Sequence, residues 1–161
     1  MRIVSTKEMA QIESSTKEEY FFDEKLIVEN VGIQAARVIS QISTEKEFTQ
    51  EILFFIGKGS NGSDGVATAR HLSNLGHKCR AFVFFNESDC SDSLLEQIKI
   101  AQSYGVLVNF IETANQVSSY MEQSGYCVIV DALFGTGVQL PLSNFLYEVI
   151  DYINSHSQFI F

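Results

Sequence analysis

The chain has 161 residues, enough for one domain with a full hydrophobic core and too few for two ordinary domains. Hydrophobic residues make up 45% of it and charged residues 19%, which excludes a disordered or collagen-like chain. The net charge of −9 argues against binding to nucleic acid or to an anionic membrane surface. Apolar runs such as 52–56 are far shorter than the ~20 residues of a membrane helix, and the start carries no apolar signal region. We therefore expect a soluble, cytoplasmic protein.

The cysteines and histidines give no sign of a structural metal site. Cys79, Cys90 and Cys127 show no C-x-x-C spacing, and two of them lie in or beside apolar runs, which favours buried thiols over a disulfide or zinc ligands. The three histidines share no ligand spacing. His71 comes late in an expected helix, where a cation interacts favourably with the helix dipole.

Two helices are expected before the first strand. Ser5 and Glu8 have the S-x-x-E spacing of a capping box, which predicts the start of a first helix. Asp23 is expected to begin a second helix, because apolar residues follow it at helical spacing as far as Ile42.

From residue 52 onward, short apolar runs alternate with helical patterns. The expected strands are 52–56, 81–85, 106–111, 126–130 and 158–161. The expected helices between them are 62–75, 91–104, 115–124 and 143–155. Gly76, Gly105 and Gly125 would end three of these helices, Ser93 and Glu96 in 91–104 have the spacing of a capping box, and Ser143 would begin the last helix. The alternation predicts a three-layer Rossmann-like α/β fold with a mostly parallel sheet, and the usual strand order of such a sheet is 3-2-1-4-5.

The first strand leads directly into a glycine-rich segment, 57–65, of sequence GKGSNGSDG, and a helix follows. Its glycines let backbone N–H groups approach an anion, and the helix N-terminus adds about half a positive charge, so a pyrophosphate is expected there. The segment fits G-x-G-x-x-G, but 77–85 lacks the acidic residue that would bind a ribose, which weakens an ordinary hydride-transfer site. The segment is not a Walker A loop, because Ser63 follows Gly62 at the position where that motif has Lys. The alternative is a tight strand-to-helix turn without a ligand.

A second glycine-containing loop follows the fourth expected strand. Asp131 comes at the end of that strand, and residues 132–141 read ALFGTGVQLP. In the expected strand order both loops border the crevice where such sheets bind ligands. Asn61, Asp64 and Asp131 would there bring together oxygen donors suited to a hard cation or to a substrate hydroxyl. The alternative for Asp64 is a carboxylate that offsets the helix dipole.

Three segments resemble the NAD(P)H-hydrate epimerase family, also called the YjeF N-terminal domain. They are 28–32 (VENVG), 57–65 together with 69–72 (ARHL), and 130–137 (VDALFGTG). The glycine loop of that family usually reads G-x-G-N-N-G-G-D-G, so Ser60 and Ser63 replace an Asn and a Gly. Ser63 reduces backbone freedom and would crowd a phosphate, whereas Ser60 can still donate a hydrogen bond.

The resemblance implies an isomerase of nicotinamide cofactor repair. Family members interconvert the R and S forms of NADHX and NADPHX, which are hydrated at C6 of the nicotinamide ring, so that a stereospecific dehydratase can repair them. The resemblance also implies a potassium ion bound by Asn61 and Asp131, a functional link to the dehydratase, and a possible homodimer. The implied substrate contacts are Ser60, Asn61, Gly62, Ser63, Asp64, Gly135, Thr136, Gly137, Val138, Gln139, Leu140 and Pro141.

The family also has a D-x-P-S-G motif just after the next strand, which supplies an Asp to the substrate and a Ser to the potassium ion. This chain ends at Phe161, within that expected strand. We therefore interpret residues 1–161 as a single domain truncated at its C-terminus, with the expected catalytic Asp beyond Phe161. Weak binding of an NADP-type nucleotide and little epimerisation are expected from these residues alone. A Gly62→Val change is expected to abolish nucleotide binding without unfolding the chain.

Two other functions are compatible with the sequence. The first is a noncatalytic nucleotide-binding or dimerisation scaffold, because domains that resemble this one occur in RNA-processing assemblies. The second is an NAD(P)-dependent oxidoreductase, which the missing acidic ribose ligand disfavours.

Overall fold

Five parallel strands form the middle layer of the structure, a computed structural model that describes residues 3–124 and 127–161. Their order is β3-β2-β1-β4-β5, and each neighbouring pair is parallel, which confirms the expected α/β fold and strand order. The strands are β1 (Ile52–Ile56), β2 (Cys79–Val83), β3 (Leu107–Phe110), β4 (Cys127–Ala132) and β5 (Ser157–Ile160). The central strand β1 is buried at every position, as expected for an apolar run covered on both faces.

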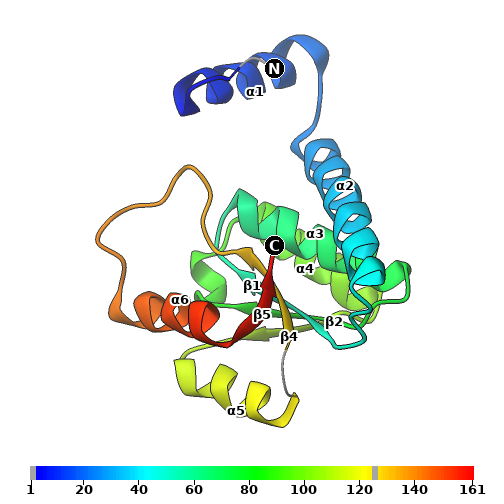
Figure 1. Cartoon of the computed structure of the whole chain (residues 1–161). Helices are drawn as coiled ribbons and strands as arrows, with labels where there is room; N and C mark the ends of the chain where they lie inside the picture. The colour runs from blue at the N-terminus through cyan, green and yellow to red at the C-terminus, as the bar shows by residue number, and fades with distance from the viewer. Residues whose placement is uncertain (1–2, 125–126) are drawn as a thin grey trace.

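Helices cover both faces of the sheet (Figure 1). One apolar cluster joins α2, α3 and α4 to one face, and a second joins α5 and α6 to the other. The helices are α1 (Thr6–Tyr20), α2 (Glu24–Glu45), α3 (Ser60–Asn74), α4 (Asp92–Ser103), α5 (Ala114–Ser124) and α6 (Asn144–His156), with a short 3-10 helix at Glu87–Asp89. The three layers therefore form as the alternation of strands and helices predicts.

The helix starts follow the expected capping residues with one correction. The capping box of Ser5 and Glu8 is present, and Asp23 Oδ1 accepts a hydrogen bond from the Lys25 N–H. The N-cap of α4 is Ser91 and not Ser93, because Ser91 Oγ accepts from the Leu94 N–H. The Ser91 N–H also donates to the Lys58 carbonyl at 2.9 Å. This contact with the segment after β1 fixes where α4 begins.

Strand β2 begins and ends two residues earlier than expected. Its register against β1 pairs Ile52 with Cys79 and Ile56 with Val83, so the pairing of β2 with β1 stops where β1 ends. The expected glycine stops occur at Gly76 and Gly105, whose φ angles of 92° and 85° lie in the left-handed region. The expected stop at Gly125 lies outside the described residues.

Helix α1 stands away from the three layers and contributes no buried residue (Figure 1). A short link at residues 21–23 joins it to α2, and Lys17 of α1 pairs with Glu24 of α2 at 3.3 Å. None of the helices in the described part of the chain is long and apolar enough to span a membrane.

Candidate nucleotide-binding site

The candidate site lies at the carboxyl ends of β1 and β4, where the strand order reverses. After Ile56 the chain enters the loop at 57–59 and then α3, and after Ala132 it enters the loop at 133–143. The Gly57 N–H donates to the Ala132 carbonyl at 3.0 Å, so the two segments are still in contact beyond the end of β1.

Asn61 links the two loops. Its Nδ2 donates to the Phe134 carbonyl at 3.0 Å, and a Cβ on Gly135 would lie 3.4 Å from the Asn61 Cβ. The two glycine loops thus meet, as the strand order predicts. No hydrogen bond within the described residues uses Asn61 Oδ1, and this oxygen could bind a ligand.

Asp131 reaches the same edge of the sheet from β4. Its side chain is exposed, and Oδ1 accepts a hydrogen bond from the Leu133 N–H at 3.0 Å. In steps of two along the chain, Asp131 lies on the same face as Ile129 and Leu133, which belong to the cluster on the α5 and α6 side. Asp131 therefore approaches the edge from the opposite face of the sheet to Asn61, which lies on α3.

The side chains at this edge are oxygen donors, which fit a hard cation better than a transition metal. No group of three or more His, Cys, Asp or Glu side chains that could hold a metal ion occurs in the described part of the chain. The donors available are the Asn61 amide oxygen, the Asp131 carboxylate and backbone carbonyls, and such oxygen donors suit a hard cation.

The glycines of the first loop are required by its own packing. A Cβ on Gly57 would lie 1.8 Å from the Leu133 carbonyl oxygen, and one on Gly62 would lie 2.1 Å from the Gly57 carbonyl oxygen. A Cβ on Gly65 would lie 2.6 Å from the Ala132 Cβ. The expectation that Gly62→Val leaves the fold unchanged therefore needs correction, because any side chain at Gly62 collides with backbone.

In contrast, Gly59 has an open face. Nothing lies within 4 Å of a Cβ built on Gly59. Gly59 is the N-cap of α3, and no side chain caps this end of the helix. Backbone N–H groups in the first turn of a helix have no intrahelical acceptor, so this uncapped end can receive an anion.

The two serines of the loop differ in exposure. Ser60 is exposed and available to a ligand. Ser63 is fully buried, and its Oγ donates to the Gly59 carbonyl at 3.5 Å. The side chain of Ser63 therefore neither crowds the site nor faces a ligand.

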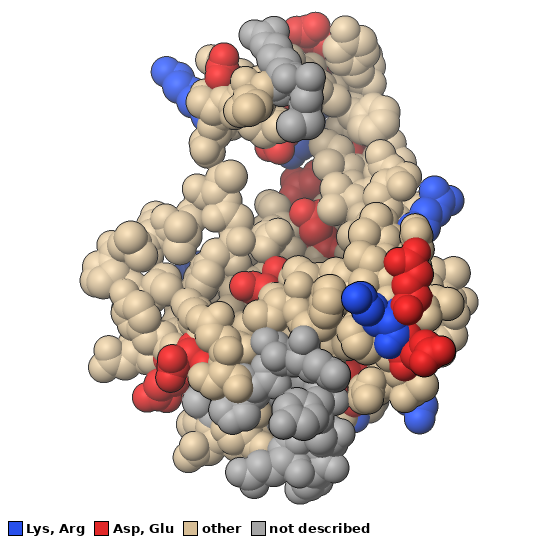
Figure 2. Space-filling view, viewed as in Figure 1, with Lys and Arg blue, Asp and Glu red and all other residues tan. Residues whose placement is uncertain are grey.

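Asp64 has an environment that the sequence does not reveal. Its side chain is half-buried, and Glu13 of α1 and Glu24 of α2 lie close enough to repel its negative charge. Burial, followed by these two carboxylates, raises the pKa of Asp64 to about 6. Figure 2 shows acidic side chains on both sides of the hollow between α1 and the rest of the molecule.

The second loop forms an exposed arm between β4 and α6 (Figure 1). Residues 135–141 are all exposed, and the Leu140–Pro141 peptide bond is cis. Residues 132–143 carry no charged side chain. This segment can therefore cover a ligand without adding charge to the site.

The first glycine loop also contacts the segment after β2, which the motifs did not indicate. Lys58 Nζ lies 5.4 Å from the centre of the Phe85 ring, and the Lys58 carbonyl accepts from Ser91. Lys58 therefore connects the first glycine loop to Phe85 and Ser91.

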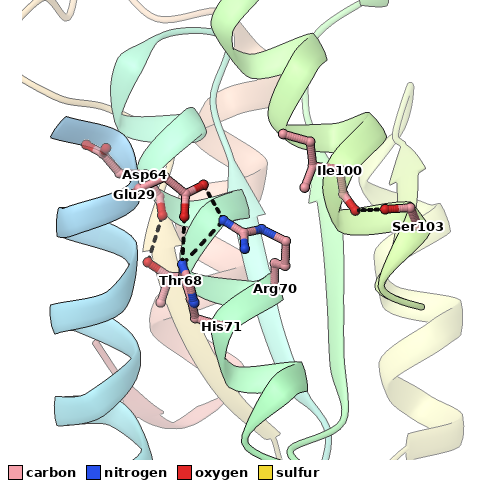
Figure 3. A network of polar contacts seen from close by, with 7 residues as sticks. All are labelled: Glu29, Asp64, Thr68, Arg70, His71, Ile100 and Ser103. Carbon is pink, nitrogen blue, oxygen red and sulfur yellow. Dashed lines mark hydrogen bonds and ion pairs between the residues drawn. The ribbon is translucent and has the colours of Figure 1, made fainter. Parts of the chain in front are cut away.

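A network centred on Glu29 fixes α3 against α2 (Figure 3). Glu29 accepts a hydrogen bond from Arg70, and His71 Nε2 lies 3.0 Å from Glu29 Oε2. Arg70 is only 8% exposed and lies over the ring of Tyr104, the C-cap of α4. Burial alone would raise the pKa of Glu29, but hydrogen bonds and charge from Arg70 and His71 outweigh it and lower the pKa. His71 thus has a specific partner in addition to its place near the end of a helix.

The cysteines described by the structure have no catalytic environment. Cys79 is buried, and burial together with nearby Glu51 raises the pKa of its thiol to about 12. Cys90 is a partly exposed free thiol whose Sγ lies 3.4 Å from the Asn86 carbonyl. The side chain of Cys127 lies outside the described residues.

One known protein family has a sequence model that matches most of this chain. The sequence model of the family "YjeF-related protein N-terminus" matches residues 24–161. The chain belongs to this family. Its match begins at the first residue of α2 and includes both glycine loops and the Glu29 network, but not α1.

Curated relatives of this YjeF-related chain are longer than the chain itself. It is 27% identical over 161 residues to the bifunctional NAD(P)H-hydrate repair enzyme Nnr of Thermofilum pendens, covering 99% of this chain and 30% of that protein. It is 30% identical over 154 residues to the NAD(P)H-hydrate epimerase of Leuconostoc citreum, covering 96% and 64%. The crystal structure of yeast ynu0 shares the fold, with a TM-score of 0.81 at 22% identity, covering 97% and 66%.

Proposed function

We propose that this chain binds hydrated NADH or NADPH and interconverts its R and S forms, as an NAD(P)H-hydrate epimerase. The observation that supports it best is the hydrogen bond from Asn61 to Phe134, which joins the two glycine loops at the uncapped N-terminus of α3. The pyrophosphate binds at that helix end, and the uncharged loop at 133–143 covers the nucleotide. The names of the relatives from T. pendens and L. citreum agree with this activity.

Direct assays test the proposal. Chromatographic separation of the two epimers of NADHX and NADPHX should show faster interconversion with the protein than in buffer, and calorimetry should show binding of NADP⁺. Gly59→Ala should weaken binding without unfolding, because its new methyl group enters open space at the helix end. Binding without faster epimerisation would favour the noncatalytic scaffold, and absence of binding would contradict both functions.

We also propose a potassium ion between Asn61 and Asp131. When bound, the ion would supply positive charge beside the phosphates of the nucleotide. Asp131→Ala should therefore remove any potassium-dependent increase in melting temperature, measured against sodium. An increase that persists in the variant would contradict this assignment.

A dehydratase is the proposed functional partner. An epimerase has a use only if a second enzyme consumes one epimer, and the relative from T. pendens is called a bifunctional repair enzyme. A coupled assay with an NAD(P)HX dehydratase should convert both epimers to NADH or NADPH, whereas the dehydratase alone should leave one epimer to react slowly.

A further inference from the structure

Helix α2 has two adjacent apolar sides, and only one of them is buried within the described part of the chain. The buried side packs against α3 and the sheet, and its residues are Val28, Gly32, Ala36, Ile39 and Ser43. Each of these is preceded in the sequence by a member of a second apolar row, which we name the α2 seam: Ile27, Val31, Ala35, Val38 and Ile42. Val31 is 40% exposed, Val38 is 55% exposed, and the other three members are partly exposed.

The composition of the α2 seam differs from that of an ordinary exposed helix surface. Single exposed apolar residues are common on monomers, but this row has five of them along about 22 Å of one helix. Valine is also a poorer helix former than alanine, lysine or glutamate, so it gives no advantage to the helix itself. The polar residues that border the row are the uncharged Asn30, Gln34 and Gln41. An apolar row with no charge at its centre is typical of the core of an interface.

The position of α2 leaves this row open to a partner. Helix α3 packs against both α2 and α4, and Figure 1 shows α2 at the margin of the molecule. Helix α1 meets α2 at its first turn, through Lys17 and Glu24. The exposed fractions of Val31 and Val38 show that solvent reaches the α2 seam beyond that turn.

The α2 seam is complementary to itself. Its residues read Ile-Val-Ala-Val-Ile in either direction, at separations of four, four, three and four positions. A second copy of α2 that lies antiparallel and crosses at Ala35 would place Val31 against the partner's Val38 and Ile27 against the partner's Ile42. The small side chain at the crossing lets the two helices approach closely. Such a surface can form a twofold-symmetric interface, in which both copies contribute the same residues.

The charges at the ends of α2 favour this antiparallel arrangement. Glu24 and Lys25 lie at the start of the helix, and Glu45 and Lys46 lie at its end. In an antiparallel pair Glu24 is near the partner's Lys46 and Lys25 is near the partner's Glu45, so unlike charges meet at both ends. A parallel pair would place each charge beside its own copy. The exposed ion pairs that Glu24 and Lys25 make within the chain can rearrange at little cost.

We propose that the α2 seam joins two copies of this chain in a symmetric dimer whose α2 helices are antiparallel and cross at Ala35. This inference does not depend on the proposed epimerase function. A single helix pair covers less than the roughly 800 Å² per partner of a standard stable interface. The dimer is therefore expected to dissociate reversibly, with a dissociation constant in the micromolar range.

Sedimentation velocity at increasing protein concentration provides the first test. The mass should rise from the 18.1 kDa of one chain to twice that value. Val38→Glu places a charge against the partner's Val31, so the dissociation constant should increase at least about 100-fold. Leu26→Glu is the matched control, because Leu26 is 53% exposed on a different side of α2, and it should change the constant less than about threefold. Far-UV circular dichroism should show the same helix content in both variants.

Cysteine substitution tests the arrangement of the two helices. Cys90, a partly exposed free thiol, is first replaced by serine. In this background Ala35→Cys places two thiols at the crossing point, within the Cα separation that a disulfide needs, so mild oxidation should give a covalent dimer. Arg37→Cys, on a different side of α2, is the control and should remain mostly monomeric.

Three results would overturn the proposal. A chain that stays monomeric at millimolar concentration would leave the α2 seam to a different partner. A dimer that withstands Val38→Glu would place the interface elsewhere on the molecule. A dimer that Val38→Glu dissociates, but that oxidation links no faster through Ala35→Cys than through Arg37→Cys, would contradict the antiparallel crossing.

Discussion

At the scale of single residues, Gly57 and Gly62 show how closely two backbone segments approach at the site. Each lacks a side chain because a carbonyl group of the protein occupies that space, from Leu133 in one case and from Gly57 in the other. Gly59 has no such neighbour. The glycines of one motif therefore divide into those required for folding and one that is open to a ligand.

This division predicts opposite outcomes for two alanine substitutions. Gly62→Ala should destabilise the fold by on the order of 2–4 kcal/mol, because its Cβ meets backbone that cannot move aside. Gly59→Ala should cost no more than about 1 kcal/mol, since its extended backbone suits any residue and only the N-cap preference changes. Urea denaturation of both variants measures the difference. Equal stability of the two would contradict the packing seen at Gly62.

Asp64 gives a pH-dependent prediction for stability. Its pKa is about 6 in the folded chain and 3.8 as a model value, so the folded state binds the proton more tightly. Stability is therefore lost as the pH rises from about 4 to above 6, where the half-buried carboxylate carries its full charge. Asp64→Asn removes this loss and should raise the melting temperature at pH 8 but not at pH 3.5. A melting temperature lower than wild type at pH 8 would contradict the assigned environment.

At the scale of elements, the packed helices α2 and α3 lie on one side of the site. Gly32 allows this pair to approach closely, because a Cβ there would lie 2.8 Å from the Ala67 Cβ. Glu29, Arg70 and His71 add a polar contact near the same interface. The segments VENVG and ARHL, which carry part of the family resemblance, thus hold the two helices together.

Loss of the Glu29 carboxylate should loosen this helix pair. Glu29→Gln leaves the buried Arg70 guanidinium without its counter-charge and should cost about 1.5–3 kcal/mol at pH 7. The pKa of Glu29 is lowered on folding, so its contribution is present above the model value of 4.5 and disappears as the pH falls through the folded value. Chemical denaturation at pH 7 and pH 3 measures both effects. Lys25→Gln, which breaks an exposed pair with Glu96, is the control and should change stability by less than about 1 kcal/mol.

The order of the elements could be predicted from the sequence more fully than their ends. Alternating apolar runs and helical patterns predicted a parallel sheet with right-handed crossovers, and the observed strand order is the usual one for such sheets. The ends of β2 depend on the length of its partner β1, and the start of α4 depends on a contact between Ser91 and Lys58. Such contacts join residues far apart in the sequence, and local patterns do not encode them.

At the scale of the whole molecule, α1 is peripheral to the fold and close to the site. It buries none of its residues against the three layers, and the family match starts after it at Glu24. Its Glu13 nevertheless acts on Asp64. The sequence predicts α1 as a helix from its capping box, but its position over the site depends on the link at 21–23, for which the sequence offers no pattern.

Removal of α1 should therefore leave the fold intact and change the pKa of Asp64. A chain that starts at Asp23 should keep its far-UV circular dichroism per residue for the core elements and melt within a few degrees of the full chain, since no buried contact is lost. The pKa of Asp64, followed by NMR, should move toward its ordinary value because Glu13 is gone and burial decreases. A chain that fails to fold would show that α1 stabilises the domain.

The placement of the acidic side chains has a consequence for the rate at which a nucleotide arrives. A dinucleotide is an anion, the chain carries a net charge of −9, and Glu13 and Glu24 lie close to Asp64 on α3. Long-range repulsion should slow the encounter, while the uncharged arm at 133–143 offers the approach with the least repulsion. Added salt shortens the range of this field to about 8 Å at physiological ionic strength. Stopped-flow measurements should therefore show association of NADP⁺ that becomes faster as salt is added, the reverse of an electrostatically steered encounter.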